Sequence, residues 1–393
     1  MIPAEDAVER IAGWQRNALL TGVAGVLAAI VAALLDREHF LRSYLFAYVF
    51  WVGMGVGCLG ILLMHHTVGG KWGMVLRRLC EAGACTLPFT IVLMIPIVLS
   101  LPALYEWARP EVMAHDVNIQ KKAGYLNVPA FLGRAILYFA VWGFYAFRLR
   151  TLSTRQDTTG DAAALQRMQR ISAPGLVVFF FVSTFAFVDW VMSLEPHWFS
   201  TIYGAMFLIG EALEAFAFTI GLLIILAKLG PMRPYVTKQH LHDLGNMMFA
   251  FMVLWAYLAF SQFLIIWAGN LPEEIPWYLR RLRNGWGWVA LALVIFHFAA
   301  PFVLLLMRDV KRQADRLLMV CILLFAIRIV DMYWLIEPAF YGDHVVVRWT
   351  DVVAFIAVGG LWLAGFFYFL KSAPLAPVRD PRLAEAPRET VAF

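Results

Sequence analysis

The chain has 393 residues, of which 62% are hydrophobic and only 15% are charged, and its formal net charge is +5. A soluble globular protein carries about 25% charged residues, so this composition argues against a soluble fold and predicts an integral membrane protein. The small positive charge reflects how the loops are distributed across the membrane and gives no reason to expect a nucleic-acid partner.

Ten apolar runs follow one another along the chain, each close to the roughly 20 residues that cross a bilayer as a helix. Lipid offers no hydrogen-bond partners to the backbone, so spans of this length must be helices rather than strands. We therefore expect an all-α integral membrane protein with ten transmembrane helices. The runs lie at about 17–35, 43–64, 84–104, 130–149, 174–194, 199–228, 246–268, 285–307, 317–336 and 351–370.

The loops indicate the orientation. An even number of spans places both termini on one side, and 21 of the 32 Lys and Arg residues fall on that side, against nine on the other. The positive-inside bias therefore predicts that both termini are cytoplasmic.

A short pattern occurs twice, as VDWVMSLEP at residues 188–196 and VDMYWLIEP at residues 330–338. The copies lie at the same depth of the fifth and ninth runs, which share an orientation, and this indicates a parallel duplication of four helices. We expect peripheral helices at 17–42 and 350–370, four-helix bundles at 43–196 and 197–338, and a cytoplasmic tail at 371–393.

Ionisable side chains inside spans cost roughly 2.5–3.5 kcal/mol each on insertion scales and usually face a bundle interior or water. Glu211 and Glu214 lie one turn apart near the middle of the sixth run, and His297 lies at a similar depth in the eighth. Two close carboxylates in a low dielectric rarely both ionise, so we expect a held or shared proton at the glutamate pair.

The two copies of the pattern differ in charge. Arg328 and Asp331 are three residues apart on the ninth run, which predicts an internal ion pair, with a structural role competing against a role in proton transfer. Alanine occupies the matching position before Asp189, so we expect Asp189 to be the better candidate to change protonation.

Titratable groups occur at three depths, which is what a proton relay requires. Structural roles compete with this interpretation: Arg77 and Arg78 could be headgroup anchors ion-paired with Glu81, the two Glu-Pro pairs could end helices outside the apolar region, and the edge histidines could be interfacial. The predicted proton path comprises His65, His66, Glu81, Asp243, Glu211, Glu214, His297, Asp189 and Asp331.

The sequence lacks the residue patterns that bind common redox cofactors. The four cysteines form no CxxC or CxxCH motif, and a b-type haem needs paired histidines at one depth, whereas only His297 lies mid-span. We expect no haem, iron–sulfur cluster or metal in this chain. The seventh run offers polar groups among aromatic residues, as a quinone site requires, although packing is the more ordinary role for such residues. The residues are Tyr257, Ser261, Gln262 and Trp267.

Three segments carry a family resemblance: LLMHHTVGGKWG at 62–73, VDWVMSLEPHWFSTIYG at 188–204, and LHDLGNMMFAFMVLWAYLAFSQFLIIWAGNLPEEIPWY at 241–278. They resemble the F-subunit family of bacterial alternative complex III, a quinol:cytochrome c oxidoreductase. More broadly, residues 15–375 are similar to the polysulfide-reductase-type (NrfD-like) membrane subunits.

The resemblance implies a subunit of the bacterial inner membrane without a redox centre of its own. Iron–sulfur and c-type haem subunits and a related quinone-binding membrane subunit would be its partners, and the predicted proton path would serve quinol oxidation elsewhere in the complex. Three alternatives remain: a quinone site in this chain, a structural anchor, and an independent transporter, against which the mostly unbroken apolar runs argue.

Overall fold

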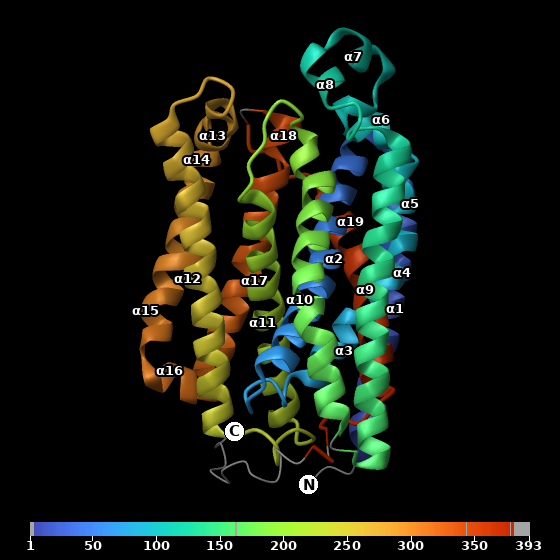
Figure 1. Ribbon diagram of the computed structural model, residues 1–393, viewed down its shortest axis with the longest axis vertical. Helices are drawn as coiled ribbons and strands as arrows, with labels where there is room; N and C mark the ends of the chain where they lie inside the picture. Colours follow the sequence, from blue (N-terminus) through green and yellow to red (C-terminus); the bar gives the residue numbers. More distant parts are fainter. Residues whose placement is uncertain (1–3, 162, 343, 378, 381–393) are drawn as a thin grey trace.

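The expected all-α fold is confirmed. This computed structural model describes residues 4–161, 163–342, 344–377 and 379–380, so most of the predicted tail lies outside the described residues. These residues contain no β-strand, and ten helical spans are long and apolar enough to cross a membrane (Figure 1). The spans are Val8–Leu35, Arg37–Val68, Arg77–Val98, Val128–Thr159, Ala163–Leu194, Tyr203–Lys228, Lys238–Gly269, Trp286–Leu306, Ala314–Tyr341 and Trp349–Lys371.

Eight spans are built on one continuous helix each. Several run to 32 residues, beyond the ~20 that a bilayer requires, so their ends project past the hydrocarbon region. The helices are α1 (Ala4–Leu35), α2 (Arg37–Val68), α9 (Val128–Thr159), α10 (Ala163–Trp190), α11 (Tyr203–Lys228), α12 (Lys238–Gly269), α17 (Ala314–Ile336) and α19 (Trp349–Lys371).

Among the ten described spans, the third and eighth are the two that are broken, in agreement with the expectation that the apolar runs are mostly unbroken. The third consists of α3 (Arg77–Ala84), α4 (Leu87–Leu93) and α5 (Ile95–Val98), with proline near the start of α4 and of α5. The eighth consists of α14 (Trp286–Leu293), a π-helical turn η3 (Val294–Ala299) and α15 (Ala300–Leu306). Proline lacks the N–H that would continue the ladder, which weakens the helix at the starts of α4 and α5, whereas α10 continues through Pro174.

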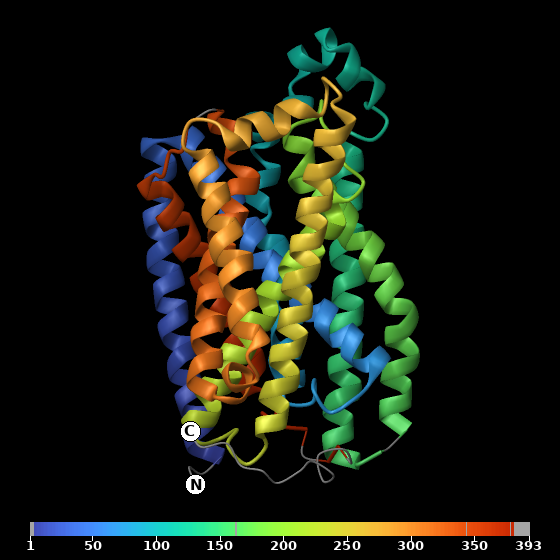
Figure 2. The same ribbon diagram turned by 90° about the vertical axis from the view of Figure 1, so that its left-hand side faces the viewer.

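The spans pack as two rings of four. The first ring contains α2, the third span, α9 and α10, and the second contains α11, α12, the eighth span and α17. The two first members, α2 and α11, lie against each other at the centre of the molecule and are its most buried helices (Figures 1 and 2). The rings have the membership of the two expected bundles.

The outer helices α1 and α19 pack along each other (Figure 2). Small residues allow this close approach, because a Cβ on Gly22 would lie 2.7 Å from the Leu361 nitrogen and one on Gly25 would lie 2.7 Å from Ala357 Cα. α19 also reaches the centre, where the Trp51 indole of α2 donates to the Phe355 carbonyl over 3.1 Å. Only α1 is therefore fully peripheral.

Short helices cap the two ends. We call the end where α1 begins and α19 ends the terminal face; α16 (Arg308–Arg312) lies there. The opposite face carries the other short helices, and α7 and α8 project from it (Figure 1). They are α6 (Leu101–Leu104), η1 (Glu106–Ala108), α7 (Pro110–His115), α8 (Val117–Lys121), η2 (Met192–Leu194), α13 (Ile275–Leu282) and α18 (Pro338–Tyr341).

Candidate functional site

A group of buried charges lies inside the second ring, and we call Glu211, Glu214, His297, Arg328 and Asp331 the central charge cluster. All five side chains are 0–2% exposed. Arg328 of α17 reaches across to α11, where its Nη2 donates to Glu211 Oε1 over 3.0 Å and its Nε lies 3.6 Å from Glu214 Oε2. Arg328 also donates to Asp331 on its own helix, so the predicted ion pair is confirmed.

Glycines make room for these charges. A Cβ on Gly53 of α2 would lie 2.1 Å from Glu211 Oε2, and one on Gly57 would lie 2.1 Å from the Glu211 carbonyl oxygen. On α11 itself, a Cβ on Gly210 would stand 2.7 Å from the Arg328 guanidinium carbon. These contacts were not predicted, although the small-xxx-small spacing of Gly53 and Gly57 is typical of close helix contact.

His297 enters the cluster from the π-helical turn of the eighth span. Pro301, four residues later, cannot donate to the His297 carbonyl, and a π turn is one way in which a helix accommodates such a gap. His297 Nδ1 lies 3.7 Å from Asp331 Oδ2, and the Trp255 ring of α12 packs against the imidazole at a centroid distance of 3.9 Å. The structure therefore brings Glu211, Glu214, His297 and Asp331 together from three helices.

Negative charge exceeds positive charge in the cluster if every carboxyl is ionised, since three carboxyl groups face one guanidinium. Several atoms also have no hydrogen-bond partner among the described residues: Glu211 Oε2, both oxygens of Glu214 and both nitrogens of His297. Buried charges need compensation, so the arrangement favours at least one proton held on the carboxylates. The central charge cluster therefore contains carboxyl and imidazole groups whose unbonded oxygen and nitrogen atoms can accept a proton.

Asp189, the first copy of the repeated aspartate, has its charged partner on another helix. Arg134 of α9 binds it in a fork, with Nε 2.8 Å from Oδ2 and Nη2 2.9 Å from Oδ1, and the Tyr138 hydroxyl donates to Oδ2 over 2.6 Å. Asp189 therefore has a charged partner, although alanine occupies the position on its own helix that matches Arg328. Each aspartate pairs with one arginine, from the preceding helix in the first copy and from its own helix in the second.

The two Glu-Pro pairs have diverged. Glu195 accepts from Arg280 at 2.9 Å and from Arg281 at 2.8 Å, which ties α13 to the end of α10. Glu337 is 0% exposed, and neither carboxyl oxygen has a hydrogen-bond partner among the described residues. Glu337 lies at the end of α17, as the structural alternative expects, and it is buried at the junction of α17 and α18.

Toward the terminal face, Glu81 forms a buried cluster in the first ring. Arg77 Nε lies 3.2 Å from Glu81 Oε1, and Arg78 Nη1 lies 2.6 Å from Oε2. Both arginines are at most 2% exposed, so they do not anchor headgroups; the local ion pair is confirmed. Arg78 further contacts Asp157 at the end of α9.

The remaining predicted path residues lie near the terminal face in separate contacts. His65 and His66 end α2, with ring centroids 5.2 Å apart, and the Trp72 ring meets His65 edge-on. Asp243, in the first turns of α12, accepts from the Gln239 amide over 2.7 Å. The two histidines are buried, and neither they nor Asp243 lie with the central charge cluster.

The four residues considered for a quinone do not converge. Gln262 is buried, accepts from Ser200 over 3.2 Å and lies 3.4 Å from the Tyr278 hydroxyl. Tyr257 and Trp267 are more than 60% exposed on the outer surface of α12, where lipid would cover them, and Ser261 is half-buried.

Within the described residues, no group of three or more His, Cys, Asp or Glu side chains could hold a metal ion. Comparison of the chain with protein-family models and with curated proteins finds no match. Fold and site together define a multi-pass, all-α membrane protein with ten candidate spans and a buried charge cluster between α11, α17 and the eighth span.

Proposed function

We propose that this chain is a proton-conducting membrane subunit of a respiratory quinol:cytochrome c oxidoreductase of the alternative complex III type, in the bacterial inner membrane. The central charge cluster carries the proposal, because ionisable groups inside spans are costly and typically mark ion pathways and proton relays. The resemblance of residues 15–375 to that family supports the choice of complex.

Arg328 would organise the transfer. By holding Glu211 and Asp331, it keeps acidic oxygens at fixed positions in a low dielectric, while Glu214 and His297 retain atoms that can accept a proton. A proton that binds Glu214 reduces the excess of negative charge around Arg328, and this favours its binding. When the proton leaves, the cluster returns to its original charge.

The outlying groups would serve as entry and exit. Glu81, His65, His66 and Asp243 lie toward the terminal face, which the positive-inside bias makes cytoplasmic, and Asp189 lies toward the opposite face. Quinol oxidation and electron transfer would take place in partners: a related quinone-binding membrane subunit, an iron–sulfur subunit and c-type haem subunits.

The test is the double variant Glu211→Gln/Glu214→Gln in the whole complex, reconstituted into vesicles. We expect quinol oxidation to continue while proton release across the membrane falls strongly, because an amide cannot carry the proton. Glu111→Gln, an exposed change on α7, is the matched control and should alter neither. Unchanged proton translocation in the double variant would refute the proposal.

A further inference from the structure

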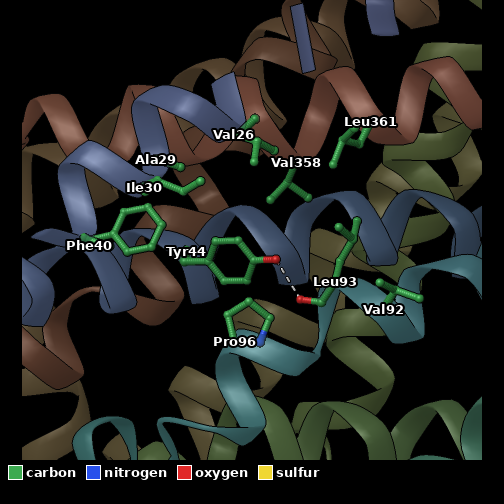
Figure 3. A pocket seen from close by; sticks show the side chains of 12 residues that line it. Val26, Ala29, Ile30, Phe40, Tyr44, Val92, Leu93, Pro96, Val358 and Leu361 are labelled. Carbon is green, nitrogen blue, oxygen red and sulfur yellow. Dashed lines mark hydrogen bonds between the residues drawn. The ribbon is translucent and has the colours of Figure 1, made fainter. Parts of the chain in front are cut away.

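A long apolar groove opens on the outer surface where α1 and α19 meet the broken third span. One part has a volume of about 340 Å³ and lies between Val26 and Ala33 of α1, Phe40 and Tyr44 of α2, and Pro96 (Figure 3). A second part, of about 330 Å³, runs from Thr86 along α19 to Phe369. Both are lined by Val92, Leu93 and Leu361, so they form one groove, which we call the α19 groove.

The length of the groove fits one leaflet. Its lining follows α19 from Ala357 to Phe369, which is roughly 18 Å at a rise of 1.5 Å per residue. Half of a hydrocarbon core of about 30 Å is about 15 Å. An extended hydrocarbon chain that enters from the terminal face would therefore lie along the groove to slightly beyond the middle of the membrane.

Three hydroxyl groups of the groove donate to backbone carbonyls. Tyr44 donates to Leu93 over 2.7 Å (Figure 3), Thr86 to Gly83 over 2.7 Å and Thr90 to Leu87 over 2.7 Å. Apart from these hydroxyls, Trp362 and Tyr368, the side chains that line the groove are apolar, so its surface suits a hydrocarbon chain.

Three basic residues lie toward the terminal-face ends of α9 and α19. The Arg150 guanidinium lies 5.3 Å from the Phe369 ring and donates to the Phe369 carbonyl over 2.6 Å, and Lys371 ends α19. Arg148 is exposed near the end of the apolar run of α9. In the part of the chain that the structure describes, no carboxylate lies within 4 Å of any of these three side chains.

A second, shallower hollow begins beside the first. It has a volume of about 380 Å³ on the surface of α9 and extends from Ala140 to Arg148 and Thr151. Phe147 lines it, and the Phe147 ring lies 6.5 Å from Phe89, which lines the α19 groove. Two adjoining apolar hollows below one cluster of cations match two acyl chains below one phosphate.

We propose that the α19 groove and the α9 hollow bind one anionic diacyl phospholipid from the leaflet at the terminal face. One chain lies along α19 against the third span and the other along α9, with the phosphate between Arg148 and Lys371. Basic pockets between spans at this level of a membrane typically bind anionic headgroups. The proposal is independent of proton conduction.

Native mass spectrometry of the full chain, delipidated and then titrated with phosphatidylglycerol or phosphatidylcholine, tests it. The first variant, Arg148→Gln/Lys371→Gln, has Arg155→Gln/Arg170→Gln as a control with the same charge change on exposed residues of the same face. The second, Gly365→Leu, fills the groove, since its Cβ would lie 3.7 Å from Thr86 Cγ2. Its control is Gly13→Leu, whose Cβ would meet nothing within 4 Å.

We expect the wild type to retain one phosphatidylglycerol and to prefer it to phosphatidylcholine. Loss of two basic residues should weaken phosphatidylglycerol binding about 30-fold and leave phosphatidylcholine binding unchanged. Gly365→Leu should weaken both, and neither control should weaken either. Equal binding of the two lipids by the wild type, binding unchanged in both test variants, or a quinone recovered from the purified chain that Gly365→Leu displaces would overturn the proposal.

Discussion

Replacing Arg328 with methionine removes the cation that stands among three carboxyl groups. Its guanidinium is fully buried, donates to Glu211 and Asp331, and lies 3.6 Å from Glu214. Removing one partner of a buried ion pair costs about 3–5 kcal/mol, because the remaining charge is left without compensation. A typical folded domain is stable by only about 5–15 kcal/mol, so we expect a large fall in thermal stability and in folded yield.

The compensating variant makes this reasoning testable. Replacing buried ion pairs by neutral groups is often close to neutral, so Arg328→Met/Glu211→Gln/Asp331→Asn, which leaves only Glu214 of the three carboxyl groups, should regain most of the lost stability. Thermal unfolding of the detergent-solubilised chain measures both, with Glu211→Gln/Asp331→Asn as the control that leaves the arginine with Glu214 alone. An Arg328→Met protein that melts with the wild type, or a compensated variant no more stable than Arg328→Met alone, would show that the cluster charges are balanced in another way.

Two further changes test how the helices accommodate these charges. Gly57→Ala should lower the free energy of unfolding by about 1–3 kcal/mol or more, because its Cβ would meet the Glu211 carbonyl at 2.1 Å and must push α2 from α11. Gly13→Ala is the control and should melt as the wild type does. An equal loss of stability in both variants would contradict this reasoning. Arg134→Gln should lower the free energy of unfolding by about 1.5–3 kcal/mol, because Asp189 loses its charged donor. Arg134→Gln/Asp189→Asn should recover part of this loss. A double variant that melts at a lower temperature than Arg134→Gln would argue against the ion pair.

The ten spans were predictable from the sequence because crossing a bilayer is a local requirement. About 20 consecutive apolar residues satisfy it, whatever the rest of the chain does. The helix ends were not predictable in the same way. α2 begins at Arg37, six residues before the apolar run, because polar residues continue a helix in water as readily as apolar ones continue it in lipid.

The breaks in the third and eighth spans depended on more than composition. Pro96 and Pro301 were visible in the sequence, yet proline inside an apolar run either kinks a helix or ends it, and the neighbouring helices decide which. In the third span the Tyr44 hydroxyl of α2 meets the Leu93 carbonyl beside the break. In the eighth, the break takes the form of the π turn that carries His297.

The amino-acid sequence is enough to show which charges lie within the apolar runs and to predict that Arg328 pairs with Asp331, three residues away on one helix. How the other acids are compensated depends on the packing of the helices. Glu211 finds its arginine 117 residues away and Asp189 finds its own 55 residues away. Helical periodicity specifies neighbours within a turn, whereas contacts between helices depend on which faces meet and how closely. Here that closeness rests on Gly53 and Gly57, where the absence of a side chain lets α11 bring its buried glutamates to the centre of the protein.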